Sequence, residues 1–266
     1  ARAMARIYAM LAGNGAIDGV RLLSPAAVER ASKLVWEDDC IMTQRRIRMG
    51  YGFMHNEPNT VPMGENMKAF GHTGTGGGNH LLWGGPSLEE NPFFGRPAWL
   101  VGILRYWQHH PSLAYLFSGH SVGPASQAPR PDEGSAAWLD LELAHGVLEG
   151  LPGGDQRIAI SETLRHLHAD KSGNTHRSEI SLDKFWNPAW TAGCQGLLEF
   201  RALESLPDHR WSSAVALLFR ALAVRLLNPE HRPAALRSWG AELHDRAMLP
   251  SSLWADLELV LADLAA

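Results

Sequence analysis

The sequence contains few cysteines, no excess of positive charge and no long apolar run. Its two cysteines, Cys40 and Cys194, lie far apart and form no Cys-x-x-Cys motif, so neither a disulfide framework nor a zinc site is indicated. This cysteine usage predicts a reducing, cytoplasmic location. The formal net charge of -4 argues against a nucleic-acid-binding protein, because such proteins need basic side chains to neutralise phosphates.

Membrane signals are also missing from the sequence. No apolar run approaches the roughly 18 residues that a membrane span needs, and no basic segment followed by an apolar one resembles a secretory leader. We therefore expect neither a membrane nor a nucleic acid among the partners. The chain starts at Ala1 without Met, in a stretch with helical periodicity, so we expect it to be truncated there.

The residues that are present predict a folded protein of the α/β (α+β) class. An apolar content of 45% and an aromatic content of 8% are enough for a core. Ser24 followed by Pro25 is a typical helix start, and we interpret the basic run at residues 45–48 as a solvated loop. Helices are predicted at residues 1–12, 24–35, 97–109, 135–149, 155–169, 211–227 and 251–264, the sixth of them apolar almost all round and so buried. Strands are predicted at residues 51–55, 67–72, 81–83, 177–184 and 196–203.

Two of these strands each carry an acid and an arginine two residues apart, Arg177 with Glu179 and Glu199 with Arg201. Because alternate strand residues point to the same side, each pair is predicted to share one face of the sheet. Two interpretations stay open. The pairs could be cross-strand salt bridges, or they could form a magnesium–phosphate site in which carboxylates hold the cation and arginines hold phosphoryl oxygens.

The first part of the chain, about residues 1–76, resembles the C-terminal half of class C β-lactamase-like serine hydrolases and esterases. The resemblance rests on ARAMARIYAMLA (1–12), GVRLLSP (19–25), YGFM (51–54) and FGHTG (70–74). It implies that the His-Thr-Gly segment lines an acyl pocket and helps to form an oxyanion hole. No Tyr-x-Asn base motif occurs, and the one Ser-x-x-Lys, SLDK at 181–184, is interpreted as chance, so we predict no serine-hydrolase activity.

The rest of the chain, about residues 74–266, resembles a predicted amidoligase domain of the glutamine synthetase-like superfamily, which is attached to large bacterial transglutaminase-like proteins. The motifs that carry the resemblance are GTGGGNH (74–80), YWQHHPSL (106–113), GPASQAPR (123–130), GNTHRSE (173–179), LEFR (198–201) and WGAELHDR (239–246). The resemblance implies an ATP- and Mg²⁺-dependent carboxylate–amine ligase. Its substrates would be a small-molecule or peptide carboxylate and an amine, and its partner a transglutaminase-like domain.

The resemblance also implies roles for individual residues. The groups expected to act on the phosphoryl group or substrate are Arg201, Arg177 and His80. The groups expected at the cofactor are Gly76, Gly77, Gly78 and Arg130. The expected metal ligands are Glu199 and Glu179. A complete site would take further carboxylates from a Glu-x-Glu strand, but Glu142 lies in a predicted helix, so we expect the metal site to be incomplete.

Both resemblances meet in the glycine-rich stretch at residues 70–80. We therefore predict two partial domains, a β-lactamase-like C-terminal fragment at 1–73 and a glutamine synthetase-like amidoligase portion at 74–266. The fold would then be a partial β-lactamase-like piece joined to the C-terminal half of a sheet-and-helix domain. The alternatives are a β-lactamase-related serine hydrolase or esterase fragment, and a non-catalytic fusion of the two that aggregates through exposed edges and apolar faces.

Overall fold

The computed structural model describes residues 2–40, 45–51, 53–59, 63–71, 78–119, 122–123, 128–133, 137–190, 193–204, 206 and 209–266. The chain divides into two compact units, Ala1–Gly76 and Gly77–Ala266, which are described separately here. Both units mix helices with antiparallel strands, which confirms the predicted α/β class. Among the described residues, no helix combines the length and the apolarity needed to cross a membrane.

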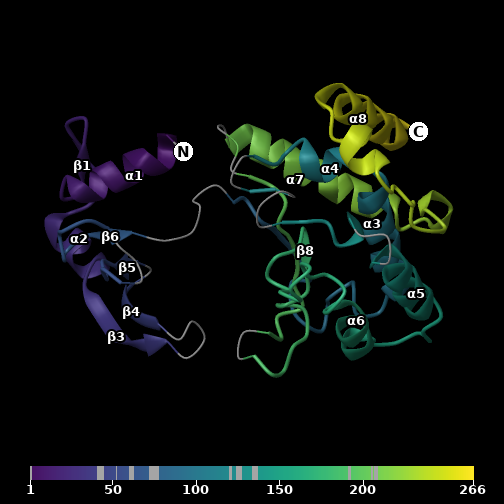
Figure 1. Ribbon diagram of the computed structural model, residues 1–266, viewed down its shortest axis with the longest axis horizontal. Helices are drawn as coiled ribbons and strands as arrows, with labels where there is room; N and C mark the ends of the chain where they lie inside the picture. Colours follow the sequence, from purple (N-terminus) through teal and green to yellow (C-terminus); the bar gives the residue numbers. More distant parts are fainter. Residues whose placement is uncertain are drawn as a thin grey trace. The chain divides into compact units, whose positions relative to one another are not determined.

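The first unit combines two helices with small antiparallel sheets, coloured purple to blue in Figure 1. Its elements are α1 (Arg2–Ala12), the ribbon β1 (Ala16–Ile17) and β2 (Val20–Arg21), α2 (Pro25–Ala31), and a sheet of β3 (Leu34–Cys40), β4 (Arg45–Gly50), β5 (Met54–His55) and β6 (Phe70–Gly71). The core of the unit joins Met10 and Leu11 of α1 to Val28 of α2, with Phe53 and Phe70 packed against them. Helix α1 therefore covers the end of the sheet at which β5 and β6 pair.

Local sequence signals explain both helices of this unit. Helix α1 ends where Asn14 and Gly15 adopt positive φ, and Gly15 is needed there because an added Cβ would lie 2.1 Å from the Leu23 carbonyl oxygen. Ser24 caps α2 as predicted, since its hydroxyl accepts a hydrogen bond from the Ala27 amide at 3.1 Å. The helix ends at Ala31, earlier than predicted, because the chain enters β3 at Leu34.

The sequence did not predict the β3–β4 hairpin, and the interpretation of residues 45–48 as a loop was wrong. These residues begin β4, which pairs antiparallel with β3. Arg46 and Arg48 stabilise the pairing by contacting Glu37 of β3, with Nη2–Oε1 at 3.0 Å and Nε–Oε2 at 3.2 Å. Charged residues dominate the paired stretch of β3 and β4 and give no clear apolar alternation, so the periodic signal for a strand is lost.

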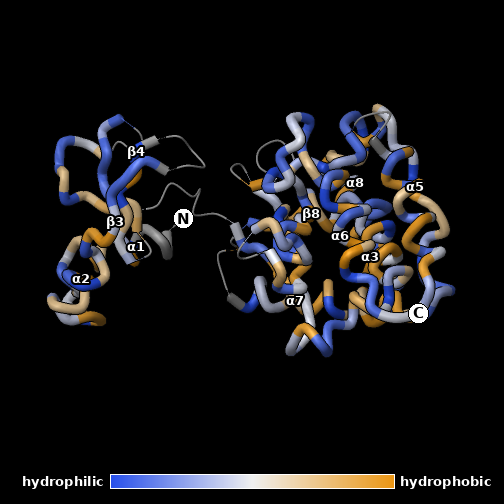
Figure 2. The backbone as a smooth tube through the Cα atoms, turned by 90° about the horizontal axis from the view of Figure 1, so that it is seen from below, coloured by the Kyte–Doolittle hydropathy of each residue, from blue (hydrophilic) through white to orange (hydrophobic). Residues whose placement is uncertain are grey.

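The second unit packs helices against a three-stranded antiparallel sheet in the order β7 (Leu81–Trp83), β9 (Leu198–Phe200) and β8 (Ile180–Ser181). The helices are α3 (Pro97–His109), α4 (Ser112–Tyr115), α5 (Ala137–Glu149), α6 (Arg157–Leu164), α7 (His209–Arg225) and α8 (Pro250–Ala265), with short turns η1 (Pro131–Glu133), η2 (Pro229–His231) and η3 (Leu243–Ala247). Figure 1 shows them from teal to yellow, and Figure 2 shows hydrophobic segments gathered in the interior around α3.

One face of this sheet forms part of the core. Phe200 of β9 contacts Trp107 of α3 and Phe219 of α7, with ring centroids 4.8 and 6.0 Å apart, and Trp83 of β7 lies 4.9 Å away. Residues 198 and 200 alternate with Glu199, so the opposite face of β9 presents polar side chains. The apolar face thus anchors β9 and fixes the direction in which its charged residues point.

Several predicted elements differ from the observed ones. The strands predicted at 177–184 and 196–203 are shorter, because only Ile180–Ser181 and Leu198–Phe200 form ladders. The predicted burial of the helix at 211–227 was wrong, since Trp211 is 59% exposed and Leu217 67% exposed on α7. Helix α3 has the predicted bounds, whereas His72, Thr73, Gly74 and the predicted cap Ser135 lie outside the described residues.

Candidate functional site

Four charged or polar side chains meet on the polar face of the sheet around Glu199. Oε1 of Glu199 lies 3.0 Å from Nδ1 of His80 and 3.1 Å from Nζ of Lys184, and Oε2 lies 3.2 Å from Nη1 of Arg201. We call these four residues the Glu199 cluster. Leu82 pairs with Glu199 across β7 and β9, so His80, two residues earlier, reaches the same face. Lys184 comes from the turn that follows β8.

The Glu199 cluster holds an ionised carboxylate in a buried position. Glu199 and Arg201 each keep only 4% of their side-chain surface exposed, whereas His80 and Lys184 keep 26%. Burial alone would raise the pKa of Glu199, but the hydrogen bonds from His80 and Lys184 and the Arg201 charge outweigh it and lower the pKa to about 2. Two permanent cations face one carboxylate, so the cluster has excess positive charge.

The glycine-rich segment places His80. Gly78 forms an antiparallel bridge with Glu204, and the Asn79 amide donates to the Leu203 carbonyl at 2.9 Å. An added Cβ on Gly78 would lie 2.9 Å from Nε2 of His80, so a side chain at residue 78 would displace the imidazole ring. Gly76 and Gly77, which were predicted to bind the cofactor with Gly78, lie outside the described residues.

A second buried group surrounds Arg130. Its Nε and Nη2 atoms contact Oδ1 and Oδ2 of Asp132 at 2.9 and 2.6 Å, and Nη2 also donates to the Gln108 carbonyl at 3.0 Å. Gln108 Nε2 in turn donates to Asp132 at 2.8 Å. This arrangement neutralises the guanidinium of Arg130, a residue that is only 2% exposed, as a buried charge requires.

The side-chain contacts of Glu179 place it in this second group and not in the Glu199 cluster. Its Oε2 accepts a hydrogen bond from Nε1 of Trp107 at 2.8 Å. Burial raises the pKa of Glu179 to about 7, although the Arg130 charge opposes the rise. Glu179 and Glu199 therefore differ in their proton affinity. They do so although their backbone segments are neighbours, since Arg201 N donates to Glu179 O at 2.7 Å.

The structure thus brings together some of the predicted site residues and separates others. His80, Glu199 and Arg201 form one cluster, and Arg130 lies with Glu179 in another. Arg177 and Glu179 were predicted to share a strand face, but they do not. Arg177 precedes β8, and its half-exposed side chain lies 3.6 Å from Asp170. The catalytic, cofactor and metal roles given to these residues remain predictions.

Sequence reasoning did not identify Lys184 as part of the site. It noticed Lys184 only through the Ser-x-x-Lys match, and the structure places Ser181 in β8 and directs Lys184 to Glu199. Glu142 is helical as predicted, and it pairs with Arg105 at 2.7 Å. Within the described ranges, no three His, Cys, Asp or Glu side chains are arranged to share a metal ion.

Comparisons with known proteins give two matches. Residues 63–266 match the family described as "Putative amidoligase enzyme (DUF2126)", a range that starts before the predicted boundary at residue 74 and overlaps the first compact unit. A stretch of 80 residues is 38% identical to the esterase/beta-lactamase LipL of Mycobacterium tuberculosis, and it covers 29% of this chain and 17% of that protein. No solved structure matches the chain. Because the family match includes most of the residues and both polar groups described above, the chain belongs to the amidoligase family DUF2126.

Proposed function

We propose that the chain carries the phosphoryl-binding part of an ATP-dependent carboxylate–amine ligase, centred on the Glu199 cluster. The observation that carries the proposal is the excess positive charge around a buried, ionised Glu199, with Arg201 and Lys184 both in contact with it. Arginine and lysine are the side chains that proteins use to hold phosphoryl oxygens. Membership of an amidoligase family supports the same reaction class.

The proposed reaction has two steps. A carboxylate oxygen of the substrate attacks the γ-phosphorus of ATP, the bond to the β-phosphate oxygen breaks, and ADP leaves with that electron pair. The amine nitrogen then attacks the carbonyl carbon of the acyl phosphate, loses a proton, and expels inorganic phosphate. Catalysis of such phosphoryl transfer is chiefly positioning and charge stabilisation, which is what a fixed Arg201 and Lys184 supply.

Glu199 would position the two cations before the nucleotide binds. Arg201 is held through Nη1, while its buried Nε has no hydrogen-bond partner among the described residues. A phosphoryl oxygen that reached this buried donor would leave the contact with Glu199 intact. A fixed donor costs little reorganisation during the reaction, and this is the main advantage of a preorganised site.

Magnesium enters this proposal together with ATP. Mg²⁺ at nucleotide sites takes one or two protein carboxylates and completes its shell with phosphate oxygens and water. Glu199 would become its protein ligand by giving up a contact with His80, Lys184 or Arg201, and the ion would reduce the charge on the phosphoryl oxygens. The described residues do not form a magnesium site without nucleotide, since Oε1 of Glu199 already contacts His80 and Lys184 and the Glu179 carboxylate contacts Trp107.

Hydroxylamine trapping tests the proposal. The chain is incubated with Mg-ATP, hydroxylamine as the amine, and succinate, L-aspartate or L-glutamate as the carboxylate. We expect a hydroxamate and ADP in equal amounts, lost in Arg201→Met and kept in the surface control Arg246→Met. If ADP forms and none of the three carboxylates gives a hydroxamate, the result would contradict ligase activity.

The similarity to an esterase/beta-lactamase supports one alternative, a serine-hydrolase fragment. It fits the resemblance noted for about residues 1–76. Hydrolysis of a chromogenic cephalosporin or of p-nitrophenyl butyrate, together with covalent labelling by a fluorophosphonate, would establish that alternative. A non-catalytic fusion would fail both this assay and hydroxylamine trapping, and the partnership with a transglutaminase-like domain stays a prediction of the resemblance.

A further inference from the structure

A cleft of about 590 Å³ lies beside the Arg130 group, on the surface of the second unit. One wall is the loop that follows α6, which Asp170 shapes by accepting hydrogen bonds from the amides of Ser172 at 2.9 Å and Asn174 at 3.0 Å. The other walls come from η1 and the start of α5. The charged residues that line the cleft are Arg130, Lys171, Arg177, Glu133, Asp140 and Asp170.

The charges that line this cleft balance, which distinguishes it from the Glu199 cluster. Three of the six side chains are cationic and three are anionic, and two of the cations already have protein partners, Arg130 in Asp132 and Arg177 in Asp170. A triphosphate carries several negative charges and would find no net positive field here, whereas a zwitterion would find a partner for each of its two charges. The cleft therefore suits a ligand that carries an ammonium and a carboxylate together.

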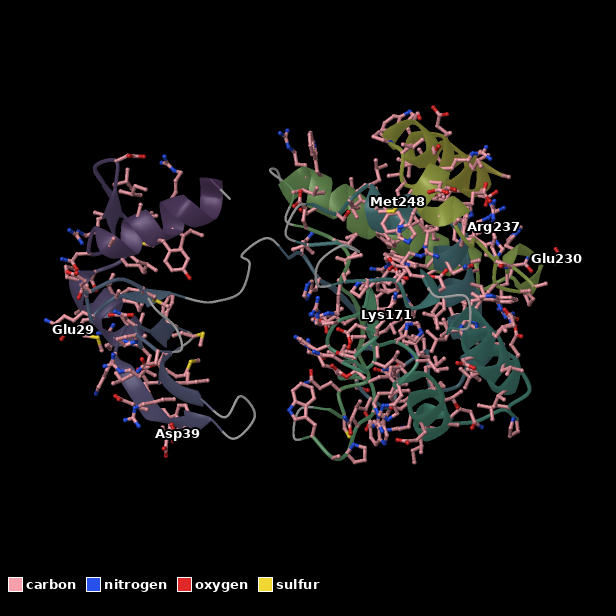
Figure 3. All side chains as sticks on the ribbon, in the orientation of Figure 1. Glu29, Asp39, Lys171, Glu230, Arg237 and Met248 are labelled. Atoms are coloured by element: carbon pink, nitrogen blue, oxygen red, sulfur yellow. The ribbon has the colours of Figure 1, made fainter. Side chains whose placement is uncertain are left out.

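Arg130 gives a specific point of attachment for the carboxylate. Its Nε and Nη2 are used by Asp132 and the Gln108 carbonyl, and its Nη1 is buried with no hydrogen-bond partner in the described part of the chain. Leaving a buried donor unsatisfied is costly, so a carboxylate oxygen that reached Nη1 would recover that free energy. Lys171, which is labelled in Figure 3, is exposed and adds a second cation at the rim of the cleft.

The anionic side of the cleft comes from two different elements. Asp140 lies in the first turn of α5 and is exposed, and Glu133 ends η1 and is half-buried. Asp170, by contrast, is occupied by the amides of its own loop and by Arg177. Asp140 and Glu133 are therefore the carboxylates available to an ammonium group.

We propose that this cleft binds a zwitterionic α-amino acid, free or as a short peptide, with its carboxylate at Arg130 and Lys171 and its ammonium at Asp140 and Glu133. The inference rests on the proposed ligase function, for which it names the class of the amine substrate. The two sites are close along the backbone, because Arg201 N donates to Glu179 O at 2.7 Å and Glu179 N donates to Pro129 O at 3.0 Å. Two strand spacings, about 10 Å, thus separate the backbones of residues 201 and 129.

Calorimetry without nucleotide tests the inference on the whole chain. The probes are L-alanine, L-glutamate and L-alanyl-L-alanine, with acetate and methylammonium as probes that carry a single charge. We expect at least one zwitterion to bind and both single-charge probes to bind about tenfold more weakly or not at all, since each satisfies only one side of the cleft. Binding of the dipeptide but not of the amino acids would identify a short peptide as the source of the zwitterion.

Two surface variants locate the binding. Lys171→Met and Asp140→Asn are expected to weaken zwitterion binding by about tenfold each, the loss of one charged contact. The matched controls Lys33→Met and Asp245→Asn, which change exposed residues outside the cleft, are expected to leave it unchanged. All four changes are at the surface, so a thermal melt should show a folded protein in each case.

Several outcomes would overturn the inference: binding of acetate as tight as that of the zwitterions, no zwitterion binding to a chain that melts cooperatively, or full affinity in both Lys171→Met and Asp140→Asn. The test also separates this inference from the proposed function. If Mg-ATP binds and no zwitterion does, the cleft assignment alone fails. If a zwitterion binds and Mg-ATP does not, the phosphoryl site fails instead.

Discussion

Two buried histidines should make the second unit sensitive to acid. His145 on α5 and His168 after α6 are 1% and 4% exposed, and none of their four ring nitrogens has a hydrogen-bond partner within the described residues. Burial lowers the pKa of His145 to about 3, helped by the charges of His168 and Arg105. Burial also lowers the pKa of His168 to about 4, against the opposing effect of Asp132.

The size of the effect follows from these pKa values. In the unfolded chain both histidines regain a pKa near 6.5, so below that pH the unfolded state binds more protons and stability is lost as the pH falls. From pH 7 to pH 5 the loss is about 2 kcal/mol for each histidine, and so about 4 kcal/mol for the pair. Glu179 acts in the opposite direction, because its raised pKa favours the folded state by about 2 kcal/mol over the same range.

The double variant His145→Leu/His168→Leu separates the two contributions. Urea unfolding is followed by tryptophan fluorescence, which reports mainly on the second unit because every tryptophan except Trp36 lies there. The free energy of unfolding of the unmodified chain should fall between pH 7 and pH 5 by about 4 kcal/mol more than that of the double variant. The single variant His168→Gln should show about half of this difference, and His231→Gln, an exposed control, should show none.

Equal pH dependence of the unmodified chain and the double variant would refute the reasoning. That result would mean that the two histidines keep an ordinary pKa in the folded state, and so that they are hydrated or hydrogen bonded. If the single variant His168→Gln kept the full pH dependence, His145 would carry the whole effect. That result would contradict the assignment of comparable pKa shifts to the two histidines.

Other predictions concern single contacts. Arg105→Met should lower the stability of the second unit by about 3 kcal/mol in urea unfolding, because Glu142 and Glu149 lose a buried partner but remain partly solvated. The surface control Arg96→Met should cost little. An equal loss of stability in both variants would contradict this prediction. Gly78→Ala should move the His80 ring and weaken Mg-ATP binding about tenfold. The melting temperature of the second unit should fall by no more than a few degrees. An unchanged affinity for Mg-ATP would show that His80 does not belong to the site. Ser24→Ala should destabilise the first unit by about 1 kcal/mol in circular dichroism melts, and no change would contradict its capping role.

The elements that the sequence predicted well have strong local signals. Helix α3 begins at a proline and carries apolar residues at helical spacing, and both features act within a few residues of the chain. The pairing of Glu199 with Arg201 on one face needed only the period of a strand, and the structure places them 3.2 Å apart. Local periodicity was therefore enough for β9 and its polar face.

The features that the sequence did not predict depend on contacts between distant segments. Arg177 and Glu179 have the same spacing as Glu199 and Arg201, yet β8 begins only at Ile180, so the two side chains find separate partners in Asp170 and Trp107. Lys184 joins the site because β8 pairs with β9, a relation between segments that no local pattern encodes. The cleft beside Arg130 likewise combines side chains from three separate stretches of the chain.

The central claim is that the Glu199 cluster binds the phosphoryl groups of ATP, and calorimetric titration of Mg-ATP tests it most directly. The account predicts one saturable site, with affinity about tenfold or more lower in Arg201→Met and unchanged in the surface control Arg246→Met. No detectable binding at millimolar nucleotide to a chain that melts cooperatively, or equal binding by Arg201→Met and the unmodified chain, would contradict it.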